Sequence, residues 1–475
     1  MFDDTIAAIA TPLGQGGLAV VRISGAGALA VTDKVFIPSG LSSVKPSAAA
    51  THTIHYGKIL RHGETIDEVL LSVLRAPRTF TRENTVEISC HGGLLPAKLV
   101  LDTVLENGAR LAEPGEFTRR AFLNGRLDLA QAEAVADLIH SRTELALAAA
   151  NEQLAGKLSQ RINQLRDELM KTLAHVEAHI DFPDEDISPD TKAQLLKRLE
   201  NGVAFMDELL RTANEGQILR RGIRAAIVGR PNAGKSSLLN QLLGYDRAIV
   251  SPIAGTTRDT IEETANIRGL PVVFIDTAGL REGRDEIEVE GIRRSRETLA
   301  RAELILHVLD ASEPLTPADE IYLAEFSAKK RILVRNKSDL PVKLELSAER
   351  RSPTRRESDG ASQLAGPEAG APVVDVCCLS GQGMEALKDA IKNLVWAGKI
   401  EAGMLQVMIN SRHQEALGRA RTATSTSIEA LRAGESLEFV ALDLRIAVNA
   451  VGEIVGKTAT EDLLDSIFSQ FCLGK

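Results

Sequence analysis

The sequence predicts a multidomain α/β protein. It has an N-terminal α+β unit, a helical domain, and an α/β domain with a parallel sheet that is inserted into the helical one. Strands and helices alternate from Arg224 to about Val395, as in a parallel sheet with crossover helices. Helical patterns flank that region on both sides. Short apolar runs interrupted by glycine and proline fill the chain from Met1 to about Pro114.

The N-terminal domain is assigned to residues 1–118. Apolar runs with the length and punctuation of strands occur at Leu18–Ser24, Glu68–Arg75 and Thr85–Cys90. A helix is predicted at Ala97–Arg110, with Gly108 as its end. The domain is therefore expected to combine a sheet with at least one helix.

The helical domain is expected in two parts, residues 119–216 and 396–475. The first part has an apolar face that recurs every three or four residues, at Leu127, Ala130, Ala134 and Leu138. Two further helical stretches follow it and are separated near Ile180–Asp190, where two prolines interrupt the pattern. The second part carries a longer stripe of the same kind, at Leu437, Val440, Ala441, Leu444, Val448, Val451 and Val455.

The α/β domain, residues 217–395, lies between the two helical parts. Domain termini usually lie close together, so insertion of a whole domain into a loop is tolerated. The polar segment Lys343–Pro372 is rich in Ser, Gly, Pro and charge and predicts a disordered surface loop. Its RRSPTRR stretch can be a basic RNA contact, but a solvated insertion is favoured for such a charge run.

Composition favours a cytoplasmic protein without a membrane span or a signal peptide. The 475 residues carry a formal charge of −9, which opposes nucleic acid except at a local basic patch. Aromatic residues make up 3%, so stacking platforms for single-stranded RNA are few. The four cysteines form no CxxC pair, which argues against a zinc site or a disulfide framework.

A phosphate-binding loop is predicted at Gly229–Ser236. Its sequence, GRPNAGKS, fits G-x-x-x-x-G-K-[ST], follows the apolar run Ala225–Val228 and leads into a helix. Backbone N–H groups of the loop and the helix N-terminus can surround the phosphates. Lys235 is then placed to reach the β and γ phosphates, and the Ser236 hydroxyl to bind Mg²⁺.

Two further segments belong to a site that senses the γ-phosphate. The AGTTRD loop offers Thr256 and Thr257, and one of these hydroxyls can complete the Mg²⁺ shell. The DTAG segment follows the predicted strand Pro271–Ile275. Its Asp276 can hold magnesium through water, and the Gly279 N–H can donate to the γ-phosphate.

The base is expected to be guanine. NKSD, Asn336–Asp339, follows the predicted strand Ile332–Arg335, and its Asp339 carboxylate can accept both the N1–H and the 2-amino hydrogens of guanine. Adenine offers no such donor pair, and sites of this kind discriminate strongly. One element is irregular: after Val373–Val376, Cys377 and Cys378 stand where Ser-Ala is usual, although a backbone N–H there can still meet guanine O6.

Leu280 raises a question about hydrolysis. Ras-type GTPases place a water-orienting glutamine directly after the glycine of DTAG, and leucine cannot form that hydrogen bond. The chain is either a switch that hydrolyses its nucleotide very slowly, or another residue holds the water.

The chain resembles the MnmE (TrmE) family of tRNA modification GTPases over essentially its full length. The resemblance rests on GRPNAGKS, IAGTTRD, DTAGLRE, RRAFLNGRLDLAQAEA at Arg119–Ala134, IDFPDE at Ile180, and above all FCLGK at Phe471–Lys475. It implies that the nucleotide is contacted by Asn232, Ala233, Gly234, Lys235, Ser236, Ser237, Ser251, Pro252, Ile253, Ala254, Gly255, Thr256, Thr257, Asp276, Thr277, Ala278, Gly279, Asn336, Lys337, Asp339, Cys377, Cys378 and Leu379.

The resemblance also implies how hydrolysis proceeds without the glutamine. G domains of this family pair and use K⁺, whose ligands here would be the Asn232 side chain, the Ser251 and Ile253 carbonyls, and Thr256. Mg²⁺ would be held by Ser236 and Thr257, and Lys235 would act with a catalytic Glu288 that works through a bridging water. Without the resemblance, Asn232 would be read as a turn residue and Glu288 as a solvated carboxylate.

A second site is implied in the N-terminal domain. The family binds a one-carbon tetrahydrofolate, in the 5,10-methylene or 5-formyl form, and the matching residues are Arg22, Glu87, Arg126 and Lys475. Arg126 stands where the family has a lysine, so it keeps the charge but not the geometry. Cys472 is a candidate for the modification chemistry, because a thiol beside a lysine can be acidified; an inert tail cysteine is the alternative.

The implied reaction adds a carboxymethylaminomethyl or aminomethyl-type group to C5 of the wobble uridine (U34) of tRNA. The implied partners are a second copy of the chain and the FAD-dependent MnmG (GidA), in a heterotetramer-like complex, with FAD on the partner only. The alternative is a ribosome-assembly GTPase of the Era or Der type. Era-type proteins end in a KH fold, and no GXXG-bearing α/β unit follows residue 396.

Overall fold

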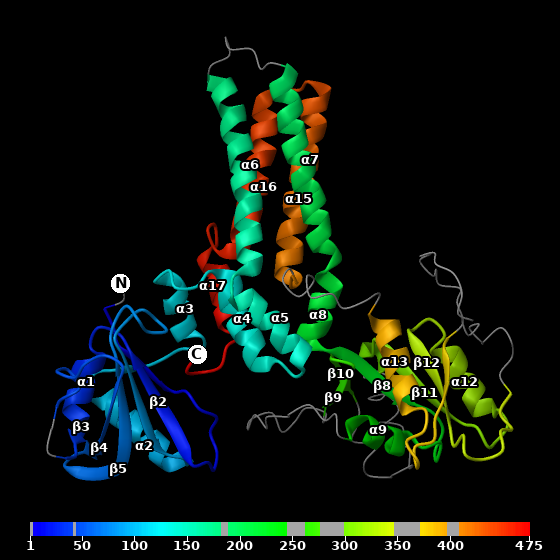
Figure 1. Cartoon of the computed structure of the whole chain (residues 1–475), viewed down its shortest axis with the longest axis horizontal. Coiled ribbons are helices and arrows are strands. Elements are labelled where there is room, and N and C mark those ends of the chain that lie inside the picture. Colours follow the sequence, from blue (N-terminus) through cyan, green and yellow to red (C-terminus); the bar gives the residue numbers. More distant parts are fainter. Residues whose placement is uncertain are drawn as a thin grey trace. The chain divides into compact units, whose positions relative to one another are not determined.

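The computed structural model describes residues 3–40, 44–181, 189–244, 262–275, 299–345, 371–396 and 408–475. The chain forms two compact units, coloured along the sequence in Figure 1. Unit 1 comprises Met1–Ala136, Glu152–Leu210 and Arg412–Lys475, and unit 2 comprises Asp137–Asn151 and Arg211–Ser411. The multidomain α/β class predicted from the sequence is therefore found.

A seven-stranded sheet forms the N-terminal part of unit 1, in the order β3-β4-β5-β6-β2-β1-β7. Its strands are β1 (Ile6–Ile9), β2 (Leu18–Ser24), β3 (Phe36–Pro38), β4 (Thr53–Arg61), β5 (Glu64–Leu74), β6 (Thr85–His91) and β7 (Arg110–Leu111). Helices α1 (Ala28–Val35) and α2 (Leu94–Glu106) pack against one face. Alternate residues of the central strands, such as Val21 and Ile23, are buried in that core.

The strands predicted in this part are confirmed. β2 and β6 follow the predicted bounds almost to the residue, whereas β5 begins four residues before the predicted start at Glu68. The predicted helix is α2, which starts earlier, at Leu94, and ends at Glu106, two residues before Gly108.

The helical part of unit 1 contains helices that precede and helices that follow the α/β region in the sequence. They are α3 (Glu116–Leu123), α4 (Leu129–His140), α6 (Lys157–Asp181), α7 (Pro189–Arg211), α15 (Ser411–Ala433), α16 (Leu437–Val455) and α17 (Glu461–Phe468). In sequence α5 (Glu144–Leu154) lies between α4 and α6, but most of it belongs to unit 2. The predicted break near Ile180–Asp190 is where α6 ends and α7 begins, and residues 182–188 lie outside the described ranges.

Helices α6, α7, α15 and α16 pack as a bundle (Figure 1). The predicted stripe of α16 is buried from Val440 to Val455, and Ala130 and Ala134 of α4 are fully buried. Ion pairs join the helices at the rim, including Arg445–Glu177 at 2.7 Å and Arg421–Asp207 at 2.6 Å. Exposed pairs of this kind contribute little, so burial of the apolar faces is the main stabilising term.

A buried carboxylate ties α4 to the start of α15. Both oxygens of Glu133 accept from Arg412 at 2.8 Å, and His413 lies 2.8 Å away. Arg412 also donates to the carbonyls of Glu453 and Ile454 at the end of α16, at 2.9 and 3.0 Å. Burial raises the pKa of Glu133, but the positive charges of His413 and Arg412 outweigh it and hold that pKa far below its ordinary value.

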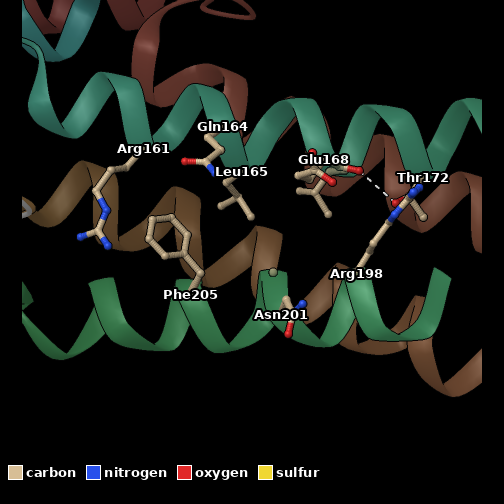
Figure 2. Close-up of a pocket in the computed structure, with 10 residues that line it drawn as sticks. Arg161, Gln164, Leu165, Glu168, Thr172, Arg198, Asn201 and Phe205 are labelled. Atoms are coloured by element: carbon tan, nitrogen blue, oxygen red, sulfur yellow. Dashed lines mark hydrogen bonds between the residues drawn. The ribbon is translucent and has the colours of Figure 1, made fainter. Parts of the chain in front are cut away.

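A groove of about 430 Å³ lies between α6 and α7 (Figure 2). Arg161 stacks over the ring of Phe205 at 5.0 Å at one end, and Arg198 lies beside Thr172 at the other. Gly202 also lines the groove, and a Cβ there would lie 3.5 Å from Leu165, an ordinary contact distance.

Unit 2 is built on a six-stranded sheet in the order β13-β12-β11-β8-β10-β9. Its strands are β8 (Ile223–Val228), β9 (Glu263–Ile267), β10 (Leu270–Phe274), β11 (Leu304–Asp310), β12 (Arg331–Asn336) and β13 (Val373–Asp375). Every neighbouring pair is parallel except β9 with β10. Helices α8 (Ala213–Arg221), α9 (Lys235–Leu243), α12 (Pro317–Glu325) and α13 (Met384–Val395) also belong to the unit.

The predicted loop Lys343–Pro372 is ordered at its start. The Lys343 N–H donates to the Ala311 carbonyl at 2.9 Å, and Leu344 is 3% exposed. Residues 346–370 of that loop lie outside the described ranges.

A segment from the helical part of the sequence packs into unit 2. Residues 137–151 belong to this unit, where Arg142 donates to the Thr264 hydroxyl of β9 at 2.5 Å. Leu145 lies against the turn at Gly269, which joins β9 to β10, and Ala146 is part of the unit 2 core. The β9–β10 hairpin is therefore held from outside the sheet.

Candidate functional site: a nucleotide pocket and a second charged cluster

The phosphate-binding loop lies at the carboxyl end of β8. This strand sits between β10 and β11, both of which follow it in sequence, so the chain order reverses at β8. Ligands of parallel sheets bind at such a switch point, beyond the carboxyl ends of the strands. The loop then enters α9 at Lys235, so the N-terminus of α9 faces the same place.

Asn336 joins the phosphate loop to the base-recognition loop. Its Nδ2 donates to the Ala233 carbonyl at 2.9 Å, and its Oδ1 accepts from the Cys378 N–H at 3.2 Å. The amide passes so close to Gly234 that a Cβ there would lie 2.1 Å from Nδ2, and Gly234 has φ 96°. Glycine is therefore required at this position for the two loops to meet.

The side chains of Lys337 and Asp339, in the same NKSD motif, lie in different surroundings. Lys337, with φ 63°, donates from Nζ to Asp310 at 2.6 Å. Burial raises the pKa of Asp310, but the hydrogen bonds from Lys337 and Ser312 outweigh it and keep that pKa below its ordinary value. The Asp339 side chain is exposed, as a carboxylate that receives a ligand must be.

The remaining described candidate residues of the phosphate-binding loop are Asn232, Lys235, Ser236 and the adjoining Ser237. Lys235 Nζ donates to the Arg230 carbonyl at 2.9 Å. Asn232 is exposed and has φ 61°, and Ser236 and Ser237 lie in the first turn of α9. These positions fit a phosphate bound at the loop and an Mg²⁺ ion beside Ser236. No group of three or more His, Cys, Asp or Glu that could hold a metal occurs within the described ranges.

Many of the expected nucleotide contacts lie outside the described residues. They are Ser251, Pro252, Ile253, Ala254, Gly255, Thr256, Thr257, Asp276, Thr277, Ala278, Gly279 and Glu288. Their roles remain predictions.

A second charged cluster forms on the N-terminal sheet of unit 1; the name Arg22 cluster is used for Arg22, Glu87, Gly474 and Lys475. Arg22 and Glu87 are directly paired across β2 and β6, and Arg22 Nε donates to Glu87 at 2.8 Å. Arg22 Nη1 also donates to the Gly474 carbonyl at 3.1 Å.

The last residues of the sequence lie against β1 and α3. Gly474 has φ 86°, and a Cβ there would lie 2.6 Å from the Ile9 carbonyl. The Phe117 N–H donates to the Lys475 carbonyl at 3.2 Å. Burial and the nearby Arg22 lower the pKa of Lys475, while Glu87 and Cys472 act in the opposite direction. The structure thus brings Arg22, Glu87 and Lys475 together.

Arg126 lies over the ring of Phe80 at 4.8 Å, and Phe80 packs against the small core cluster that includes Phe117. Arg22 lies 5.7 Å from the centre of the Phe117 ring, so each of the two arginines lies over a different aromatic ring. Burial, with the charge of Arg82, lowers the pKa of Arg126. Cys472 is exposed and its thiol is free. The positions of Phe80 and Phe117 were missed, because nothing in their sequence neighbourhood marks them as partners of an arginine.

The loop, strand order and Asn336 contacts define unit 2 as a P-loop GTPase domain, an enzyme class that hydrolyses GTP. Comparison with known proteins identifies the family. The profile "GTP-binding protein TrmE N-terminus" matches residues 5–126, and "MnmE helical domain" matches residues 129–472. The chain belongs to the MnmE family, and the Era or Der alternative is not supported.

Three relatives illustrate this, each named "tRNA modification GTPase MnmE". The protein of Geobacillus kaustophilus is 47% identical over 476 residues, which covers 99% of both chains. Those of Listeria welshimeri and Bacillus velezensis are each 46% identical, over 473 and 475 residues, and cover 99% of this chain and 99% and 100% of their own. Among solved structures, the G domain of the T. maritima FeoB iron transporter is 22% identical over 36% of this chain and 98% of its own, with a TM-score of 0.23.

Proposed function

We propose that this chain hydrolyses GTP during modification of tRNA, and that the modified position is C5 of the wobble uridine. The names of the relatives support the tRNA role. The added group is of the carboxymethylaminomethyl or aminomethyl type, with MnmG supplying FAD chemistry and a tetrahydrofolate supplying the one-carbon unit. No helix in the described parts of the chain is long and apolar enough for a membrane span.

The observation that carries the GTPase part is the position of Asn336. One amide holds the phosphate loop through Ala233 and the base loop through Cys378, so both ends of a nucleotide are read by one rigid frame. Asp339, three residues further on, supplies the carboxylate that selects guanine.

Hydrolysis without a glutamine requires another source of positive charge and another water-orienting group. Asn232 is suited to hold K⁺, because its side chain carries an amide oxygen and is exposed on the phosphate-binding loop. A cation beside the phosphates stabilises the transition state as an arginine finger does, by roughly 10³–10⁵-fold. Glu288 is proposed to orient the water and Lys235 to bind the β and γ phosphates.

Comparison of GTP turnover in KCl and NaCl at equal ionic strength tests this mechanism. We expect turnover in KCl to exceed turnover in NaCl by at least roughly tenfold, with the 10³–10⁵-fold effect of an arginine finger as the upper bound. Equal, slow rates in both salts would remove the potassium mechanism and leave the P-loop assignment standing.

The Arg22 cluster is proposed as the tetrahydrofolate site. A glutamate can accept two N–H bonds from a pterin ring, and Arg22 and Lys475 can bind carboxylates or carbonyls. The Arg22 and Glu87 side chains are 18% and 30% exposed, so they are reachable from solvent although they bond each other. Arg126, over the Phe80 ring, extends the positive region.

Exposed apolar residues on strands β4 and β5 of the N-terminal sheet support a homodimer. Ile54, Tyr56 and Leu70 are 68%, 51% and 46% exposed on adjacent strands β4 and β5, where Tyr56 pairs with Leu70. An exposed apolar group of this kind is typical of an interaction surface. We propose that a second copy of the chain covers it.

The modification itself is tested by nucleoside analysis of tRNA from cells that lack this protein. We expect the C5 group on the wobble uridine to disappear and to return when the chain is restored. Intact modification would rule out the tRNA role.

A further inference from the structure

The base-recognition loop lacks the usual hydroxyl that fastens it. Cys377 and Cys378 occupy the Ser-Ala positions, and both side chains are buried. Burial, with the charge of Cys377, raises the pKa of the Cys378 thiol to about 11, so it stays neutral. A neutral thiol is a weak hydrogen-bond donor. Other contacts must therefore hold this loop in place.

Backbone hydrogen bonds give the loop its own shape. The Cys377 N–H donates to the Gln382 carbonyl at 2.9 Å, and the Gly381 N–H donates to the Cys377 carbonyl at 2.9 Å. Both bonds join residues of the same turn. They do not set its distance from the phosphate loop.

Two side-chain amides supply that attachment. Asn336 accepts from the Cys378 N–H at 3.2 Å, and Gln241 Nε2 donates to the Cys378 carbonyl at 2.8 Å. The peptide groups on both sides of Cys378 are thus held from two directions. Asn336 comes from the NKSD motif, whereas Gln241 comes from α9 and belongs to no motif.

The position of Gln241 on α9 links the two ends of the nucleotide site. The same helix begins at Lys235, in the phosphate loop, and Gln241 lies six residues later, under two turns along. Gln241 also lines a cavity of about 550 Å³ together with Ser237, Cys378, Leu379 and Lys388. The helix whose N-terminus faces the phosphates therefore also fixes the distance between the phosphate-binding loop and the base-recognition loop at Cys378.

We propose that Gln241 is a positioning residue for guanine recognition. Its amide holds the Cys378 carbonyl, and through it holds the backbone N–H groups of Cys377–Leu379 where they meet guanine O6. The proposal rests on the GTPase function proposed above and deepens it, because it assigns part of the base selectivity to a residue outside the motifs.

The test is nucleotide affinity of the full chain with Gln241→Met, which keeps the length of the side chain and removes the donor. We expect GDP to bind about threefold to tenfold more weakly, the usual contribution of one neutral hydrogen bond. Gln241→Lys restores a donor and should recover most of the affinity. Asn240→Ala, an exposed neighbour that lines the same cavity, serves as the matched control and should bind like wild type.

Base analogues distinguish loss of the contact with guanine O6 from a general weakening of nucleotide binding. The 6-thio analogue of GDP replaces O6 by a poorer acceptor, whereas IDP keeps O6 and lacks the 2-amino group. In Gln241→Met we expect the preference for GDP over the 6-thio analogue to shrink, and the preference for GDP over IDP, set by Asp339, to persist.

An unchanged GDP affinity, or an equal loss for all three nucleotides, would overturn the role of Gln241. Either result would leave wild-type guanine binding intact. Failure of the wild-type protein to prefer guanine to adenine nucleotides would instead overturn the proposed function itself.

Discussion

The nucleotide site and the Arg22 cluster are assembled in opposite ways. Each described part of the nucleotide site follows directly from a strand of one sheet, so local sequence carries it into place. The Arg22 cluster joins β2 to Gly474, 452 positions away, and depends on how the end of the chain lies on the N-terminal sheet. A site made of contiguous motifs tolerates change elsewhere, whereas a site made across the whole fold does not.

The largest effect is expected at Asp339, where a change should weaken guanine binding and leave the Arg22 cluster unaffected. Replacing Asp339→Asn removes the carboxylate that accepts from guanine, and we expect GTP affinity to fall by roughly 10³–10⁵-fold. The new amide can donate to the 2-oxygen of xanthine, so XTP binding should rise. Fluorescent-nucleotide titration measures both, and 5-formyltetrahydrofolate affinity should stay unchanged. Retained GTP affinity would contradict the assignment of Asp339.

Catalysis and binding separate in Glu288→Ala. Loss of a group that orients or activates water lowers kcat by about 10²–10⁴-fold, while GDP and GTP affinity should remain. Single-turnover phosphate release in KCl buffer measures the step. Glu286 in the same acidic run provides the matched control, and Glu286→Ala should turn over normally. Unchanged turnover in Glu288→Ala would assign the role to another residue.

The Arg22 cluster is tested by Arg22→Met. We expect 5-formyltetrahydrofolate to bind about tenfold to hundredfold more weakly, as for loss of a charge-assisted hydrogen bond. Calorimetric titration measures it, and GTP affinity should not move, because no motif of the nucleotide site includes Arg22. Arg75→Met, which removes bonds to Ser47 and Ala49 on the same domain, controls for general destabilisation. Equal folate binding in Arg22→Met and wild type would remove the site.

The two units should also differ in their response to acid. Burial, reinforced by Arg331, lowers the pKa of His307 in β11 from 6.5 to about 4, and neither ring nitrogen has a hydrogen-bond partner among the described residues. The unfolded chain therefore binds this proton more readily than the folded one. Stability of unit 2 should fall as pH drops below 6.5, by roughly 2–3 kcal/mol at about pH 4.5.

In unit 1, Glu133 makes stability begin to fall at a lower pH than His307 does in unit 2. Its pKa is lowered in the folded state, so its contribution to unit 1 is present above its ordinary 4.5 and is lost only as pH falls below that value. Chemical unfolding followed at about pH 7, 5.5 and 4.5 distinguishes the pH dependence of unit 1 from that of unit 2.

His307→Leu should remove the loss of unit 2 stability between pH 6.5 and about 4.5, whereas His62→Leu, at an exposed histidine, should not. An unchanged pH profile in His307→Leu would contradict the burial argument.

The smallest effect concerns the β9–β10 hairpin. Arg142→Met removes the hydrogen bond to Thr264 and should destabilise unit 2 by about 1 kcal/mol. Amide hydrogen exchange in β9 and β10 should become faster. Arg161→Met, which removes a stacking contact on α6 of unit 1, is the control and should leave hairpin exchange unchanged. Equal exchange in Arg142→Met and wild type would mean that Leu145 alone holds the hairpin.

Strands, helices and the phosphate loop could be predicted because each depends on neighbours in sequence. The apolar stripe of α16 has a period that only a helix can bury on one side, and the loop at Gly229–Ser236 needs glycine between a strand and a helix. The contact of Gln241 with Cys378 could not be predicted in this way. A glutamine on a helix turn has no sequence feature that marks its partner 137 positions away.

The sequence by itself determined many of the helices and strands, the class of nucleotide site and the family, since these follow from periodicity and contiguous motifs. Only the tertiary structure decided that the Gly474 carbonyl accepts from Arg22, that residues 137–151 pack with β9 and β10, and that Asn336 spans two loops. Such contacts depend on how separate elements pack against one another, and packing is set by the shapes of buried surfaces drawn from the whole chain.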